Sequence, residues 1–302
     1  MRGRKVRRRG VGLAAVVMGV ALIAAGCSDD GDDGGLTVAA ANFPESNILA
    51  QIYGQALEAG DVGEDVTIEE DYGTRPALLD GLDNGDVGLT PEYVGALLNE
   101  LEGPDTATAD ADADVAALNS ALEDDDLVAF EPSEAQNVDA LAVTQDTATE
   151  FGLETYTDLA AVAGQLTLGA PAECAEFPAC IPGLRDTYGI EFGNFVPLEA
   201  GPPIFEALNN GDIDVARVFS TDAPIAENDL MVLVDDQGLN PAQNVIPVAR
   251  AEFDKAKIAD VVNAVSAALT TEELTELNRR VVLDKEDPED VAKDFLEDKG
   301  LD

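Results

Sequence analysis

Apolar residues along the chain alternate between two spacings, one typical of strands and the other typical of helices. In the first part of the chain, short apolar runs predict strands at 36–40, 66–68 and 87–89. Between and after them, stripes that repeat every three or four residues predict helices at 48–57, 76–82 and 93–101. This βαβαβ order predicts a parallel sheet with helices on its faces.

The same alternation restarts at residue 141, after an acidic, Ala-rich stretch expected to form a solvated helix within 104–126. Further strands are expected at 141–144, 166–169, 195–198, 213–219 and 245–249. The remainder is helical, at 258–269, 272–281 and 288–299, and we expect this tail to pack back onto the first lobe. The sequence therefore predicts an α/β protein with two lobes, 36–140 plus 245–302 and 141–244.

A short internal repeat supports two similar lobes. Residues 82–87 (LDNGDV) and 208–213 (LNNGDI) carry nearly the same phrase, in which a helix is expected to end at a left-handed Gly before a strand. A common turn arising twice by chance is the alternative. Ligands of open α/β sheets bind beyond the carboxyl ends of strands, so 90–93 and 219–222 are expected to face each other across a cleft between the lobes.

The first 26 residues have the features of a secretion signal. A cationic segment precedes an apolar run at 11–25, which is shorter than the roughly twenty residues of a membrane span. The run ends in AAGC, which resembles the lipobox of bacterial lipoproteins, with Cys27 as the acylated residue; a plain signal peptide is the alternative. Residues 27–35 are polar and Gly-rich, typical of a flexible tether. We therefore expect an extracytoplasmic protein, anchored by Cys27 to the outer face of the cell membrane.

Charge and cysteine content narrow the function classes. After Cys27 the chain has 11 basic and 61 acidic residues and no His, a net charge of −50. Such a surface repels nucleic acid and anionic lipid, so neither is expected as a partner. Adaptation to a saline habitat explains this acidity better than ordinary solubilisation does. Cys174 and Cys180 in an exported chain predict a disulfide worth about 2 kcal/mol, and two cysteines without His argue against zinc.

Six segments carry a family resemblance: 42–46 (NFPES), 73–75 (GTR), 91–95 (PEYVG), 140–144 (ALAVT), 219–222 (FSTD) and 234–239 (VDDQGL). In order and spacing the chain resembles the substrate-binding proteins of glycine betaine, carnitine and choline type osmoprotectant ABC importers. The resemblance implies a type II periplasmic-binding-protein fold that closes over a small polar solute. It also implies an ABC permease and an ATPase as partners, and no cofactor or metal; we expect a monomer.

Members of this family hold trimethylammonium groups in a cage of aromatic rings, which attract a cation that cannot donate hydrogen bonds. The resemblance places Tyr93, Asp139, Phe219 and Gln243 at cage positions, so half of the cage is polar here. Asp139 could pair with a cationic amine, which favours a choline-like ligand, or could be an exposed loop acid. Tyr93 could alternatively belong to the core.

Further candidate ligand contacts lie in loops near the cleft. They are Asn42, Phe43, Thr74, Arg75, Thr221 and Asn244. Arg75 is the obvious group to pair with a ligand carboxylate, and a solvated residue at a helix start is the alternative. Ala41 stands where the family often has Lys, and Phe177 falls near the family's carboxylate-binding Arg.

The sequence argues against an enzyme. It has no His, no Gly-x-Ser-x-Gly elbow and no phosphate-binding Gly-Lys-Ser/Thr loop. A ligand-sensing module coupled to a signalling partner is the alternative to an importer component. The ligand itself stays open among glycine betaine, choline, carnitine and related solutes.

Overall fold

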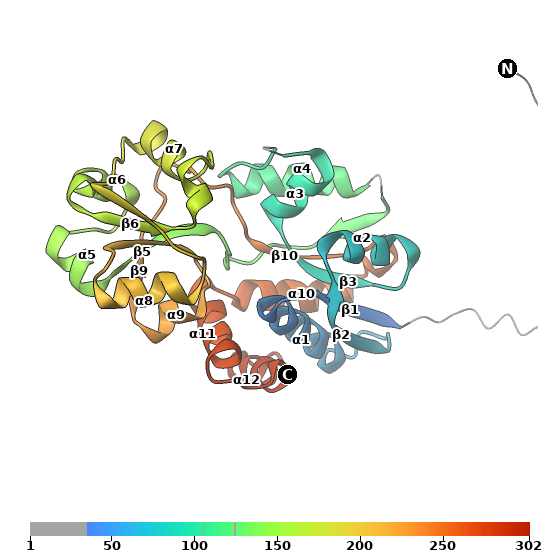
Figure 1. Cartoon of the computed structure of the whole chain (residues 1–302). Helices are drawn as coiled ribbons and strands as arrows, with labels where there is room; N and C mark the ends of the chain where they lie inside the picture. The colour runs from blue at the N-terminus through green and yellow to red at the C-terminus, as the bar shows by residue number, and fades with distance from the viewer. Residues whose placement is uncertain (1–34, 105, 124) are drawn as a thin grey trace, which may run out of the picture. The chain divides into compact units, whose positions relative to one another are not determined.

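The computed structural model describes residues 35–104, 106–123 and 125–302 (Figure 1). The predicted signal sequence, Cys27 and the tether up to residue 34 lie outside the described residues. In the described part, the strands form two five-stranded sheets, each covered by helices and each with its own hydrophobic cores. The predicted α/β class is confirmed.

The first sheet has the strand order β2-β1-β3-β10-β4. Its strands are β1 (Leu36–Ala41), β2 (Val66–Gly73), β3 (Leu89–Tyr93), β4 (Leu127–Ala129) and β10 (Val245–Arg250). The helices that follow β1, β2 and β3 are α1 (Pro44–Ala59), α2 (Arg75–Asn84) and α3 (Val94–Glu102), and α4 (Ala111–Glu123) precedes β4. A strand was predicted at 87–89, but β3 begins only at Leu89 and continues through Pro91 to Tyr93.

The second sheet repeats this plan with the order β7-β6-β8-β5-β9. Its strands are β5 (Asp139–Thr144), β6 (Thr167–Ala170), β7 (Asn194–Pro197), β8 (Val215–Phe219) and β9 (Leu230–Val232). Its helices are α5 (Gln145–Phe151), α6 (Tyr156–Ala160), α7 (Ile181–Gly183), α8 (Pro202–Asn210) and α9 (Ala223–Glu227). The disulfide between Cys174 and Cys180, with Cα atoms 5.2 Å apart, closes the loop before α7.

The βαβαβ unit is parallel as predicted, since β1 pairs in parallel with both β2 and β3, but each sheet also contains antiparallel strands. β10 runs antiparallel to both β3 and β4, and β5 runs antiparallel to both β8 and β9. Both strands come directly after the chain has passed from one sheet to the other, and each enters its new sheet in the opposite direction. Strand direction depends on that long-range connection, which local hydrophobic spacing does not record.

The repeated Asn-Gly phrase has the predicted conformation in both halves. α2 ends at Gly85 with φ 89°, and α8 ends at Gly211 with φ 74°, both in the left-handed region. The strands that follow, β3 and β8, each occupy the third place in their sheets. The repeat therefore marks equivalent positions in two similar lobes.

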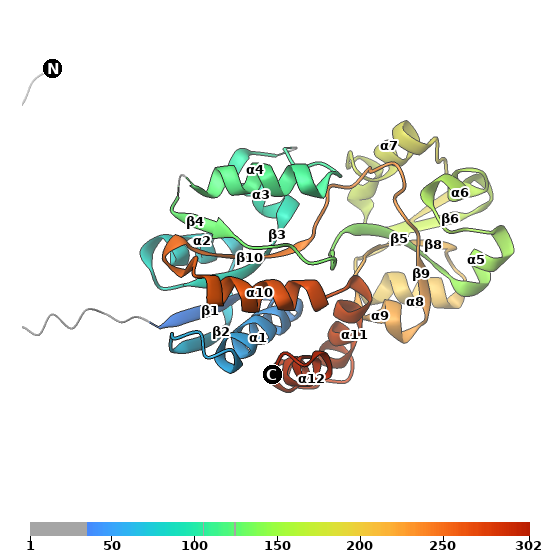
Figure 2. The ribbon, with the colours of Figure 1, turned by 180° about the vertical axis from the view of Figure 1, so that it is seen from behind.

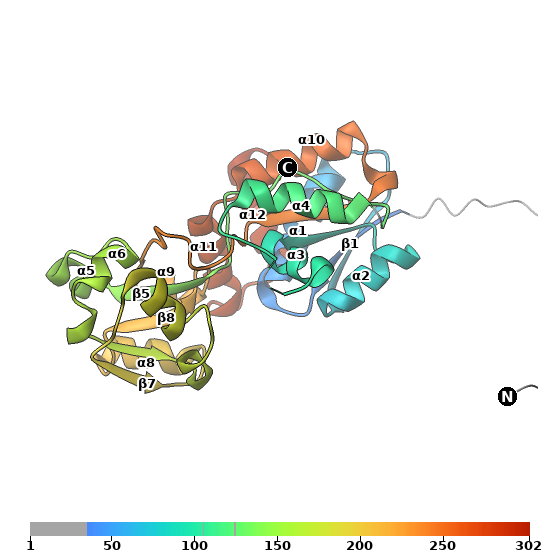
Figure 3. The same ribbon diagram turned by 90° about the horizontal axis from the view of Figure 1, so that it is seen from above.

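The C-terminal tail consists of α10 (Ala256–Ala268), α11 (Thr271–Val282) and α12 (Pro288–Lys299). α10 and α12 pack on α1 and share a hydrophobic core with the first sheet. α11 packs against α1 and α12 on one side and against α9 of the second lobe on the other (Figure 2). This helix therefore touches both lobes, which lie beside each other when seen from above (Figure 3).

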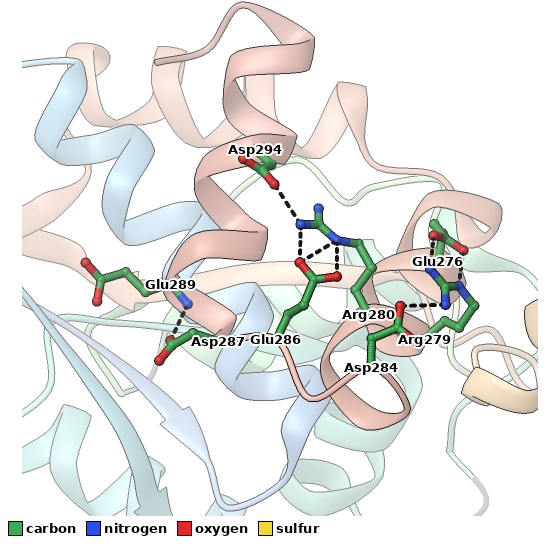
Figure 4. A network of polar contacts seen from close by, with 8 residues as sticks. All are labelled: Glu276, Arg279, Arg280, Asp284, Glu286, Asp287, Glu289 and Asp294. Carbon is green, nitrogen blue, oxygen red and sulfur yellow. Dashed lines mark hydrogen bonds and ion pairs between the residues drawn. The ribbon is translucent and has the colours of Figure 1, made fainter.

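Ion pairs fix the hairpin of α11 and α12 (Figure 4). Arg279 contacts Glu276 and Asp284, and Arg280 contacts Glu286 at 2.5 Å and Asp294 at 2.6 Å. The Asp287 carboxylate accepts a hydrogen bond from the Glu289 N–H and caps α12. The position of α11 is thereby tied to the helix that follows it.

The chain passes between the sheets in segments 130–138 and 233–244, which lie side by side. Gln136 and Asn244 form an antiparallel bridge between them. The Asn244 Nδ2 also donates to the Ser133 carbonyl oxygen at 2.8 Å. A pair of strands linked in this way is the place where the two lobes can bend relative to each other.

Candidate functional site

A cavity of about 240 Å³ lies where the two lobes meet, and we call it the cage cavity. Tyr93 enters it from the end of β3 and Phe219 from the end of β8. Asp139 enters from the start of β5, and Gln243 from the crossing segment 233–244. These are the four residues that the sequence placed at cage positions, and the structure brings them together. Asn137 and Asn240 add polar groups to the same wall.

A second cavity, of about 380 Å³, adjoins the first, and we call it the acidic cavity. Asn137 and Phe219 line both cavities. The acidic cavity also contains two carboxylates, Glu45 and Asp222, and the buried amide of Asn278 from α11. Of the predicted contacts, Phe43, Phe219 and Thr221 line this second cavity.

Glu45 is a buried carboxylate of the acidic cavity, with 5% of the residue exposed. Pro44 starts α1 directly after the loop that leaves β1, so Glu45 lies in the first turn, where the helix dipole favours negative charge. Its Oε1 accepts hydrogen bonds from the Tyr93 hydroxyl and from Asn137 Nδ2, the latter at 2.7 Å. Its Oε2 accepts from Asn278 Nδ2 at 2.5 Å. All three donors are neutral groups. Among the described residues, no Lys or Arg forms an ion pair with Glu45.

Tyr93 is held in place by this carboxylate. Burial, and then the nearby negative charge of Glu45, raises the pKa of the Tyr93 hydroxyl well above its ordinary value. The hydroxyl therefore stays protonated and donates to Glu45. The ring packs near Phe43, with the ring centres 6.4 Å apart and the planes at 27°. Phe219 leaves almost half of its surface exposed on the other side of the cleft.

Three oxygen atoms at the site are buried without a hydrogen-bond partner among the described residues. They are Asn137 Oδ1, Asp139 Oδ1 and Asn278 Oδ1. A buried acceptor without a donor costs free energy. The site therefore favours a ligand that supplies positive charge or hydrogen-bond donors.

Asp139 is already paired within the protein. Its Oδ2 lies 2.6 Å from Arg217 Nη2 on β8, and the Arg217 guanidinium lies over the Phe177 ring at 5.7 Å. Burial raises the pKa of Asp139, and Arg217 opposes that shift. The charges of Asp139 and Arg217 compensate each other at pH 7. Asp139 therefore acts on a ligand mainly as a hydrogen-bonding group and not as a net negative charge.

Asp222 contributes a second carboxylate to the acidic cavity. Its Oδ2 accepts a hydrogen bond from the Phe219 N–H at 2.9 Å. Burial raises the pKa of Asp222, this hydrogen bond lowers it, and the charge of Glu45 raises it further. The charge of Glu45 therefore disfavours the ionised form of Asp222, and a cation near both carboxylates would oppose this effect.

Four predicted contacts line neither cavity. Arg75 Nε donates to both carboxylate oxygens of Glu92, at 3.0 and 2.9 Å, and Glu92 is buried. Thr74 precedes the first residue of α2, and Asn244 binds the Ser133 carbonyl in the hinge. The Asn42 N–H donates to the Gly73 carbonyl oxygen.

Basic side chains are engaged elsewhere throughout the described residues. Each Lys and Arg there contacts a carboxylate or a backbone carbonyl oxygen: Arg75, Arg185, Arg217, Arg250, Lys255, Lys257, Arg279, Arg280, Lys285, Lys293 and Lys299. None of them lines the cage cavity or the acidic cavity. Both cavities are therefore lined by acidic side chains and by no basic ones among the described residues.

Comparison with known proteins places this two-lobed fold in a family. Residues 34–298 match the family described as the substrate binding domain of the ABC-type glycine betaine transport system. The chain belongs to this family. Among relatives, the carnitine transport binding protein OpuCC of Listeria monocytogenes is 29% identical over 260 residues, which cover 84% of this chain and 83% of that protein. The glycine betaine-binding protein YehZ of Escherichia coli is 28% identical over 272 residues, covering 85% of this chain and 88% of that protein.

Solved structures agree with this membership. A crystal structure described as a glycine betaine/carnitine/choline ABC transporter superposes with a TM-score of 0.82 at 27% identity and covers 88% of this chain and 99% of that chain. The predicted type II periplasmic-binding-protein fold is confirmed by this match. Members of the family are substrate-binding proteins of importers, which act outside the cytoplasm and are not enzymes.

No helix among the described residues combines the length and apolar character needed to cross a membrane. No group of three or more His, Cys, Asp or Glu side chains in the same residues is arranged to hold a metal ion.

Proposed function

We propose that this chain is the lipid-anchored solute-binding component of an ABC importer and that it binds a quaternary amine in the cage cavity. Tyr93 and Phe219 supply aromatic faces for a trimethylammonium group, and each such contact is worth about 1–2 kcal/mol when desolvated. The relatives named for carnitine and glycine betaine binding support this class of ligand.

Among quaternary amines, we propose that the cognate solute lacks a carboxylate, as choline does. The observation that carries this proposal is the Glu45 carboxylate, which is buried beside the cage and neutralised by no Lys or Arg among the described residues. Glycine betaine and carnitine would bring a second negative charge to this place. A buried carboxylate without a cationic partner costs several kcal/mol.

Calorimetric titration of the purified protein with choline, carnitine and glycine betaine tests this proposal. We expect choline to bind at least tenfold more tightly than glycine betaine. Equal or tighter binding of glycine betaine would refute the preference for a carboxylate-free solute. Heat signals from none of the three would refute a quaternary-amine site.

Two variants of matched chemistry locate the ligand. Phe219→Ala should weaken binding of the preferred solute at least tenfold, because the loss of one desolvated cation–π contact corresponds to about that factor. Phe192→Ala removes a partly buried ring of the same lobe that lines neither cavity, and should leave the affinity unchanged. Similar affinities of the two variants for the solute would show that the ligand does not contact Phe219.

The lipid anchor is tested separately. We expect Cys27→Ala to shift the protein from the membrane fraction to the soluble extracytoplasmic fraction of the producing cells. Retention of the variant on the membrane would contradict anchoring through Cys27. The resemblance of the AAGC segment to a lipobox supports this part of the proposal.

A further inference from the structure

The acidic cavity contains an acceptor that a quaternary ammonium group cannot use. Asn278 is 5% exposed, and its Oδ1 is buried without a hydrogen-bond partner in the described part of the chain. Its Nδ2 donates to Glu45 Oε2 at 2.5 Å and to the Thr221 carbonyl oxygen at 2.9 Å. An N–H or O–H donor in the cavity would remove the cost of burying this oxygen, and a trimethylammonium group has no such donor.

The orientation of the amides at this site is fixed by chemistry. A carboxylate only accepts hydrogen bonds, and the Thr221 carbonyl oxygen also only accepts. The nitrogen atoms of Asn278 and Asn137 must therefore face Glu45, and rotating either amide would turn an oxygen toward the carboxylate. Both amide oxygens are left as acceptors on residues that line the acidic cavity.

Charge in the cavity favours the same kind of ligand group. Glu45 and Asp222 both line it, and no Lys or Arg does. Its remaining walls are largely apolar and include Phe43, Phe205 and Leu283. Two carboxylates and a free amide oxygen inside apolar walls suit a small cation that carries N–H donors.

The acidic cavity is also close enough to the cage cavity for one solute to occupy both. Asn137 and Phe219 line the two cavities together. The Tyr93 hydroxyl and the Asn278 amide bind opposite oxygens of the same Glu45 carboxylate. Two hydrogen bonds and one carboxylate limit their separation to about 7 Å.

We propose that the acidic cavity is a subsite for an N–H-donating cation, a primary or secondary ammonium or a guanidinium group. The group belongs to the same solute whose quaternary head occupies the cage cavity, so this inference rests on the proposed function. The cognate solute is then a dication with a spacer of about three carbon atoms, a length that suits the separation of the two groups of contacts.

Two synthetic probes that differ in one group test the subsite. (3-Aminopropyl)trimethylammonium carries both cations, and butyltrimethylammonium replaces the ammonium by a methyl group of similar size. Titration calorimetry of the purified protein should show the amine probe binding at least tenfold more tightly, because its ammonium forms charge-assisted hydrogen bonds in the acidic cavity.

A pair of Asp→Asn variants assigns that preference to the cavity. In Asp222→Asn the ratio of the two dissociation constants should fall to about one third of its wild-type value or less, because one of the two cavity charges is lost. Asp212→Asn makes the same chemical change on an exposed residue of the same lobe that lines neither cavity, and should preserve the ratio. Thermal unfolding of both variants monitors folding.

The outcomes separate the subsite from the function on which it rests. Equal affinity of wild-type protein for the two probes overturns the subsite, while tight binding of choline in the same experiment leaves the proposed function standing. A preference that survives Asp222→Asn unchanged also overturns the subsite. Failure of both probes and of choline to bind overturns both proposals.

Discussion

The ion pair between Arg75 and Glu92 predicts that Arg75 stabilises the fold and does not bind the ligand. The Glu92 side chain is 4% exposed, whereas the Arg75 side chain is 27% exposed. Replacing Arg75 by Met keeps the apolar stem and leaves a buried carboxylate without its cation. Breaking a buried pair in this way costs about 3–5 kcal/mol, and the partial exposure of Arg75 places the expected cost near 3 kcal/mol.

Glu92→Gln should be much milder. It removes the buried charge, keeps an acceptor for the Tyr93 N–H, and leaves an arginine that water can reach. We expect about 1 kcal/mol for this variant. For a chain of this size the difference appears as a fall in Tm of roughly 6–12 °C for Arg75→Met against about 2–4 °C for Glu92→Gln.

The pH dependence adds an independent check. Burial raises the pKa of Glu92 above 4.5, and Arg75 opposes the shift, so the carboxyl of Arg75→Met should have a still higher pKa. A carboxyl whose pKa is raised by folding favours the native state below its unfolded pKa and loses that contribution as pH rises through the folded pKa. The Tm difference between wild type and Arg75→Met should therefore be largest near pH 7 and shrink toward pH 4.5.

Differential scanning fluorimetry and calorimetric titration measure stability and ligand affinity on the same samples. An equal loss of stability in Arg75→Met and Glu92→Gln would refute the asymmetry expected for a buried carboxylate. A weaker affinity for solute without a lower Tm would show instead that Arg75 binds the ligand. The second result would restore a basic group to the site and undermine the preference for carboxylate-free solutes.

Three further predictions concern stability. Replacing Cys174 and Cys180 by Ala should lower the free energy of unfolding by about 2 kcal/mol, a modest loss because the closed loop is short. Thermal unfolding with and without reductant measures this loss. An effect of reductant on the double variant would contradict the prediction. Gly211→Ala should cost about 1 kcal/mol in denaturant unfolding because φ is 74°, and an unchanged midpoint would be inconsistent with a left-handed cap. Arg280→Met should lower Tm by a few degrees in dilute buffer, because it removes the ion pairs with Glu286 and Asp294. The fall in Tm should be smaller in 1 M salt, which screens exposed charges. The same fall in Tm at both salt concentrations would contradict this prediction.

Elements with long periodic patterns were predictable from the sequence. The tail helices α10, α11 and α12 lie within two residues of their predicted limits. The short strands β4 and β9 were missed, because three residues at a sheet edge are too few to show periodicity. The limits of β3 were also predicted wrongly, since Pro91 argues against a central strand. In the sheet Pro91 lies opposite Pro247, so two residues without an N–H face each other.

The site was predictable in part. The resemblance pointed to Tyr93, Asp139, Phe219 and Gln243, which the fold gathers in one cavity. Glu45 as a site residue and Asn278 were missed, although each lies on the apolar stripe of its helix, at three or four residues from buried positions. A polar residue on such a stripe is a usable signal of a buried polar site.

Arg217 had no comparable signal. Alternation along β8 does not show that the Arg217 side chain reaches Asp139 on the neighbouring antiparallel strand, because strand order is a long-range property. Asp222 lies in the segment 219–222 that the sequence placed at the cleft, but nothing in the sequence showed that a second carboxylate would lie near it. Glu45 reaches the same cavity from α1, a distant part of the chain.

The reach of α11 across both lobes has a consequence for how cargo is handed over. The Asn278 amide that touches Glu45 also fastens the Thr221 carbonyl of the opposite lobe. Separation of the lobes to release the solute therefore requires the hydrogen bond between Asn278 and the Thr221 carbonyl to break. Substitutions that weaken this hydrogen bond should increase the rate of solute release and also lower the affinity for the solute. The rate of delivery and the strength of binding are thus linked through one side chain.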